Sequence, residues 1–185
     1  MSLFQDDTNA FHDPDDQYGL SEVGRAFVAG LLRHASEITA VTNQLVNSYK
    51  RLVPGFEAPN TISWARNNRS ALVRIPRHKA GKHVSTRVEY RAPDPACNPY
   101  LAFALILAAG MKGVRERYEL PPEAPDNLHR LSDAERSDLG IGTLPRSLAQ
   151  ALEDMESSQL VQDTLGPHIF EWFVRNKNSE WADYK

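Results

Sequence analysis

Residues 85–92 read Ser85-Thr86-Arg87-Val88-Glu89-Tyr90-Arg91-Ala92, and they carry the clearest structural pattern in the chain. Side chains point alternately to the two faces of an extended strand. Arg87, Glu89 and Arg91 therefore share one face, and Val88 and Tyr90 share the other. This alternation predicts a β-strand with one charged face and one apolar face.

Two stretches upstream, residues 61–65 and 70–75, predict further short strands. A helix is expected on each side of the strands. Ser21 can cap the first helix, and Asn98 can cap the second, with Pro99 at the first helical position, where the missing amide donor is harmless. The predicted fold class is α+β: a small, mostly antiparallel sheet from the strands at 61–65, 70–75 and 85–92, packed against helices that start near residues 21 and 99.

Composition limits the classes of protein to which the chain can belong. Its 185 residues, 41% of them hydrophobic, suffice for one packed domain or a large part of one. The single cysteine, Cys97, rules out an internal disulfide, which fits a reducing cytoplasm. The longest uncharged apolar stretch, residues 100–111, is shorter than the roughly 20 residues that a membrane span needs. We therefore expect a cytoplasmic protein that has no membrane partner.

Positive charge is concentrated in the middle of the chain. From Lys50 to Arg91 there are ten basic residues and two acidic ones, Glu57 and Glu89, although the whole chain carries a formal net charge of -3. A local surplus of eight positive charges between acidic flanks indicates an anion site rather than a generally basic surface. Nucleic acid is not the expected anion, because the basic strands are not interleaved with exposed aromatic residues.

Spacing alone leaves two interpretations of the charged residues. Arg87, Glu89 and Arg91 form either an exposed sheet face with cross-strand ion pairs or a site where arginines hold phosphates and Glu89 reaches them through a metal cation. Glu57, between Pro54 and Pro59, is either a solvated loop residue or a gate that closes over a site and accepts a proton. From spacing alone the first interpretation is favoured in both cases.

Three blocks of sequence resemble the glutamine synthetase family and occur in that family's order. Residues 47–59, Asn-Ser-Tyr-Lys-Arg-Leu-Val-Pro-Gly-Phe-Glu-Ala-Pro, resemble the signature around its glutamate-flap loop. Residues 68–76 contain Asn-Arg-Ser-Ala and Arg-Ile-Pro, which resemble its phosphate-binding strand. Residues 87–101 resemble its metal-bearing strand and the helix after it, and residues 165–170 are also similar. The resemblance thus covers nearly the whole chain.

The resemblance implies which residues handle glutamate and ammonia. Arg51 and Arg91 would bind the glutamate carboxylates. Glu57 would close the site and take a proton from ammonium, and Arg69 would stabilise the transferring phosphoryl group. The family uses ATP to phosphorylate the side chain of glutamate, and ammonia then displaces the phosphate.

The resemblance also implies a nucleotide and metal site. Arg74 and Arg87 would hold the phosphates of ATP, and Glu89 would ligate a catalytic Mg²⁺ or Mn²⁺. Clustered arginines and a metal-bound carboxylate suit phosphoryl transfer, because they stabilise the charge that develops on the phosphoryl group.

Residues 1–185 are expected to be the C-terminal part of the family's catalytic domain. The N-terminal β-grasp domain and the first half of the catalytic domain, which supplies most metal ligands, would then lie outside the chain. The full-length protein is expected to form a homo-oligomer of stacked rings, and the isolated chain is expected to be inactive. In some bacterial members a tyrosine of a polar loop is adenylylated. His129 stands at that position here, so regulation by adenylylation is not expected.

Two alternatives to glutamine synthetase stay open. One is a related ligase of the same superfamily that joins glutamate to a larger amine or a polyamine. The other is a fragment that folds or associates without catalysis. The intact Glu57 and the block at 47–59 favour glutamine synthetase itself.

Overall fold

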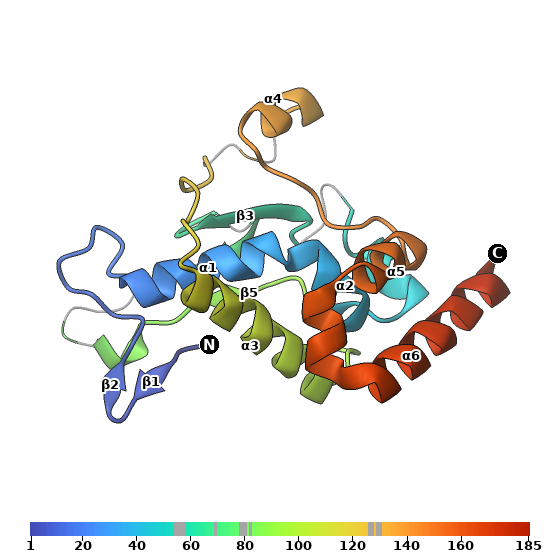
Figure 1. Cartoon of the computed structure of the whole chain (residues 1–185). Helices are drawn as coiled ribbons and strands as arrows, with labels where there is room; N and C mark the ends of the chain where they lie inside the picture. The colour runs from blue at the N-terminus through green and yellow to red at the C-terminus, as the bar shows by residue number, and fades with distance from the viewer. Residues whose placement is uncertain (54–57, 69, 78–80, 82, 126–127, 129–130) are drawn as a thin grey trace.

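The computed structural model describes residues 1–53, 58–68, 70–77, 81, 83–125, 128 and 131–185, and every structural statement below concerns these residues. A small sheet lies against helix α1, and α1 in turn packs on helix α3 (Figure 1). Helices α2, α5 and α6 pack beside this pair. In chain order the elements are β1 (Phe4–Gln5), β2 (Thr8–Asn9), α1 (Glu22–Arg33), α2 (Ala35–Thr42), the 3₁₀ helix η1 (Val46–Lys50), β3 (Thr61–Ala65), β4 (Ala71–Arg74), the 3₁₀ helix η2 (His83–Ser85), β5 (Glu89–Tyr90), α3 (Pro99–Glu116), α4 (Asp133–Asp138), α5 (Leu148–Glu156) and α6 (Gln159–Tyr184).

Both predicted helix starts are confirmed by their caps. The Ser21 hydroxyl accepts a hydrogen bond from the amide of Gly24 at 3.1 Å, which fixes the start of α1. The Asn98 side chain accepts from the amides of Tyr100 and Leu101 at 3.0 and 3.4 Å, with Pro99 as the first residue of α3. Each cap satisfies amide donors that the first turn of a helix leaves without partners.

The α+β class is confirmed, but one strand pairing runs in the other direction from that expected. The main sheet has the order β3-β4-β5, and β4 and β5 pair antiparallel as predicted. Strands β3 and β4 pair parallel, with Thr61 beside Ala71 and Ala65 beside Arg74. Between Ala65 and Ala71 the chain must therefore return toward the start of β3, a distance that five extended residues can span because they reach about 17 Å. Alternation along a strand carries no information on its direction, so the sequence did not reveal this return.

Strand β5 is also shorter than the predicted strand at 85–92, although its alternation extends beyond the paired residues. Thr86, Val88 and Ala92 are 2, 0 and 0% exposed, whereas Arg87 between them is exposed. The buried side anchors the segment in the core. The charged side is therefore held outward, as the alternation predicted.

Helices α1 and α3 make a close approach that depends on glycine. A Cβ atom added at Gly30 would lie 2.3 Å from the carbonyl oxygen of Ala109, and one added at Gly113 would lie 2.1 Å from that of Ala26. Backbone oxygens cannot move aside without moving their helix. A side chain at either position would therefore force the two helices apart.

Gly30→Ala is expected to lower stability by roughly 2 kcal/mol, because the overpacking cost exceeds the gain in helix propensity. Gly142→Ala is the matched control, because its nearest neighbour, Cδ1 of Ile62, would lie 3.6 Å from the added atom. Thermal unfolding of the two variants measures the difference. Equal midpoints would contradict the close packing of α1 on α3.

The isolated chain is expected to self-associate, because α3 carries apolar side chains on its outer face. Tyr100, Phe103 and Leu107 are 85, 65 and 49% exposed. A contiguous apolar surface on a helix favours association in water. Phe103→Glu should reduce the mass measured by light scattering, whereas Leu139→Glu, at an exposed position after α4, should not. A monodisperse monomer at high concentration would count against this expectation.

Every helix among the described residues is too short or too polar to span a lipid bilayer.

Candidate functional site

The charged face of the sheet forms one ion-paired cluster. Arg74 and Glu89 lie opposite each other on β4 and β5. Nε and Nη2 of Arg74 are 2.8 and 2.7 Å from Oε2 of Glu89. Nη2 of Arg87 is 3.5 Å from the other carboxylate oxygen, Oε1. The Glu89 carboxylate therefore sits between two guanidinium groups.

This cluster is open to solvent and carries unbalanced positive charge. The side chains of Arg74, Arg87 and Glu89 are 34, 45 and 29% exposed. Two guanidinium groups share one carboxylate, so one positive charge is left for an incoming anion. Guanidinium groups bind phosphate and carboxylate oxygens in pairs. The simpler interpretation is met by one cross-strand ion pair, Arg74 with Glu89, and the same geometry suits an anion site.

The two arginines that the resemblance assigns to glutamate are both linked to the segment that follows β5. Arg51 directly follows η1, and its Nη1 is 3.7 Å from Oδ2 of Asp94. Arg91 directly follows β5, and its backbone amide donates to the carbonyl of Leu72 at 3.0 Å. Nη1 of Arg91 lies 3.5 Å from the carbonyl oxygen of Ala71, its acceptor. Strands β4 and β5 and the residues flanking β5 thus carry four predicted site residues, and Asp94 in the turn after β5 contacts Arg51.

Two predicted site residues, Glu57 and Arg69, lie outside the described residues. The same holds for His129, which stands at the position of the family's modified tyrosine. Their roles remain predictions from the sequence.

A metal ion would need ligands beyond those gathered here. The described part of the chain contains no group of three or more His, Cys, Asp or Glu residues that could hold a metal. Both oxygens of Glu89 face arginines, and one carboxylate cannot satisfy the octahedral oxygen ligation of Mg²⁺. The described residues alone therefore do not fit a metal site, and Glu89 could serve only as one ligand among several.

Neither the cysteine nor the tyrosines Tyr49 and Tyr90 suit nucleophilic or acid–base chemistry. Burial raises the pKa of the Cys97 thiol, and the charge of Asp94 raises it further. The thiol therefore stays protonated and a poor nucleophile. Burial also raises the pKa of the Tyr49 and Tyr90 hydroxyls well above the usual range, so both remain neutral.

Asp94 is the functional candidate that sequence reasoning missed. It belongs to Pro93-Asp94-Pro95, a block that carried the resemblance without an assigned role. Its contact with Arg51 joins distant parts of the chain, and periodicity does not report such contacts. An acid held between two prolines, next to a segment rich in arginine, was the available signal.

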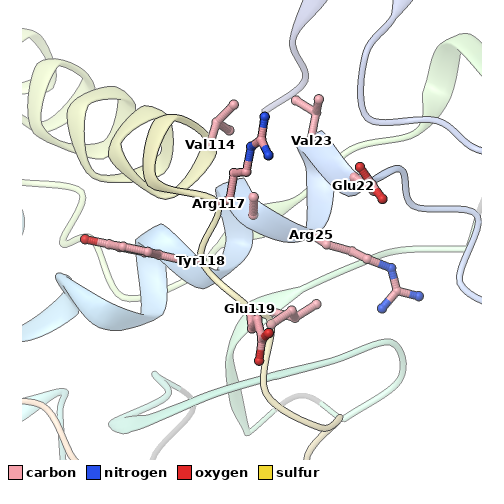
Figure 2. A pocket seen from close by; sticks show the side chains of 9 residues that line it. Glu22, Val23, Arg25, Val114, Arg117, Tyr118 and Glu119 are labelled. Atoms are coloured by element: carbon pink, nitrogen blue, oxygen red, sulfur yellow. The ribbon is translucent and has the colours of Figure 1, made fainter.

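A separate cavity of about 770 Å³ lies between the start of α1 and the segment that follows α3. In Figure 2, Arg117 lies between Val114 and Val23, while Tyr118 points away from them. None of the predicted site residues lines this cavity. The residues that line it are Glu22, Val23, Arg25, Ala26, Val114, Arg117, Tyr118, Glu119 and Leu120. The lining acids and bases are balanced and Arg25 is already paired with Asp16, so the arginine cluster is the better candidate site.

Comparisons with known proteins point to one family. The family model described as glutamine synthetase, catalytic domain, matches residues 1–185. The chain is 58% identical over 185 residues to a glutamine synthetase of Mycolicibacterium smegmatis and 51% identical over 184 residues to one of Thermotoga maritima. These matches cover 100% of the chain but only 42 and 41% of the two relatives. The chain therefore spans about two-fifths of the length of these curated relatives.

Two solved structures are similar to the chain in fold. A structure of GmaS in complex with ADP superposes with a TM-score of 0.77 at 37% identity, covering 95% of the chain and 39% of that structure. GmaS without ligand gives a TM-score of 0.76 at the same identity, covering 95% of the chain and 38% of the structure. The likeness thus extends to the three-dimensional arrangement of the helices and the small sheet.

Proposed function

Because the chain belongs to the glutamine synthetase catalytic-domain family, we propose that it forms part of an enzyme that joins ammonia to the side chain of glutamate at the expense of ATP. The observation that carries this proposal is the match of the catalytic-domain family to all of residues 1–185. The two arginines around Glu89 support it, because the reaction must bind the phosphates of a nucleotide. The full-length protein would act as a homo-oligomer of stacked rings.

In this proposal the arginine cluster receives the nucleotide. Arg74 and Arg87 hold phosphate oxygens of ATP. Glu89 would be one ligand of a Mg²⁺ or Mn²⁺ ion, and the other ligands would come from outside the described residues. Such an ion would neutralise charge on the transferring phosphoryl group. The ADP complex of the similar GmaS structure is consistent with a nucleotide site in this fold.

Glutamate would lie beside the nucleotide, held by its carboxylates on Arg51 and Arg91. The γ-phosphoryl group passes from ATP to an oxygen of the glutamate side chain, and ADP is released. Arg69 stabilises the charge of that transfer. Ammonium gives a proton to Glu57, and ammonia attacks the activated carbonyl carbon and expels phosphate. Holding both substrates next to each other supplies much of the rate enhancement.

A hybrid enzyme tests this proposal. The chain would replace the matching residues of the M. smegmatis glutamine synthetase, to which it is 58% identical. The hybrid should form glutamine and ADP from glutamate, ATP and ammonia. Activity only with a larger amine, such as methylamine or putrescine, would favour the related amine ligase. A folded hybrid that consumes no ATP with any of these amines would overturn the proposal.

A further inference from the structure

We propose that Asp94 is a positioning residue that holds Arg51 in the orientation that binds glutamate, an inference that rests on the function proposed for Arg51. Asp94 need not touch the substrate. It would act by fixing one edge of the Arg51 guanidinium group.

The Asp94 carboxylate is held in place by its own turn. Its backbone amide donates to the carbonyl of Thr42 at 2.9 Å, and its Oδ1 accepts from the amide of Ala96 at 2.9 Å. Its carbonyl accepts from the amide of Cys97 at 2.9 Å. Nε2 of Gln44 donates to the carbonyl of Ala96 at 3.0 Å and ties the turn to the segment after α2. The carboxylate is therefore a fixed point, and its side chain is only 13% exposed.

The turn uses one carboxylate oxygen and leaves the other for Arg51. Oδ1 accepts from Ala96, whereas Oδ2 lies 3.7 Å from Nη1 of Arg51. Nη1 is buried and makes no hydrogen bond among the described residues, while 37% of the Arg51 side chain is exposed. One edge of the guanidinium group thus faces Asp94, and part of the side chain stays accessible. A guanidinium group has five N–H donors, so enough remain for a substrate carboxylate.

Fixing Arg51 in advance should improve glutamate binding. A free arginine side chain loses much rotamer freedom when it binds a ligand, and a partner that holds it beforehand reduces this loss. The same turn follows Arg91 by three residues, so it also sets the spacing between the two arginines proposed for glutamate. A purely structural role for Asp94 would stabilise the turn and leave glutamate affinity unchanged.

Asp94→Asn in the hybrid enzyme separates these two roles. Asparagine keeps Oδ1 for the amide of Ala96 but removes the charge that faces Arg51. The KM for glutamate should rise about fivefold, the scale of one partly exposed ion pair, with kcat and the KM for ATP little changed. Asp183→Asn, at an exposed position of α6, is the matched control and should change none of these values.

A double variant shows whether Asp94 acts through Arg51. Arg51→Gln alone should raise the KM for glutamate more than Asp94→Asn does, and adding Asp94→Asn to it should cause no further rise. Additive effects, or an unchanged KM for glutamate in Asp94→Asn, would overturn the inference while the unaltered hybrid still makes glutamine. A folded hybrid without any activity would instead overturn the proposed function, and this inference with it.

Discussion

Glu89→Ala in the hybrid enzyme is expected to reduce the rate of glutamine synthesis by about a thousandfold or more, since a metal-bound charge contributes several kcal/mol to transition-state stabilisation. The substitution removes the carboxylate between Arg74 and Arg87 and leaves their two positive charges without a counter-ion. It also removes the metal ligand that we propose. Steady-state rates at saturating glutamate and ATP measure the loss.

Two further variants distinguish a catalytic role of Glu89 from a structural one. Glu89→Gln keeps a hydrogen-bond acceptor for Arg74 but lacks the charge that a metal needs, so it should lose nearly as much activity with less loss of stability. Glu171→Ala, at an exposed position on α6, should retain full activity. Near-normal rates in Glu89→Gln would show that the ion pairs stabilise the sheet and take no part in catalysis.

Arg69→Ala should also nearly abolish turnover, since the resemblance places its charge on the transferring phosphoryl group.

The secondary structure was predictable where local physics determines it. The strand around Glu89 alternates because one side faces the core, and Ser21 and Asn98 begin helices because their side chains accept hydrogen bonds from amides of the first turn. The direction of β3 relative to β4 depends instead on contacts distant in sequence. The amide of Ile62 donates to the carbonyl of Gly142, and that of Leu144 to Asn60, so the other edge of β3 is occupied by residues 142–144.

The same division applies to the candidate site. Alternation predicted that Arg87 and Glu89 share one face of the strand, and the surplus of basic residues predicted an anion site. The pairing of Arg74 with Glu89 required the register of β4 on β5, and the contact of Arg51 with Asp94 required the turn after β5 to lie near η1. Side-chain partners from separate elements are set by tertiary packing, which no single stretch of sequence encodes.

The isolated 185-residue chain is expected to make no glutamine from ATP, glutamate and ammonia. Its described residues gather arginines but not enough carboxylates for a metal, and Mg²⁺ gives up its water reluctantly unless several oxygens replace it. The chain also spans only 42% of a relative such as the M. smegmatis enzyme, so much of the substrate-binding cleft would have to come from elsewhere.

The size of the expected loss follows from these two deficits. Losing the metal removes several kcal/mol of transition-state stabilisation. Losing the part of the substrate-binding cleft that would come from elsewhere removes the positioning of the substrates, which contributes on the order of 7 kcal/mol or more. Because every 1.4 kcal/mol or so is a factor of ten, the rate should fall by many powers of ten. A coupled assay for ADP release together with direct detection of glutamine, run beside the hybrid enzyme as a positive control, measures the difference. Glutamine formation by the purified chain at a rate near that of the hybrid would show that these residues hold a complete metal and substrate site.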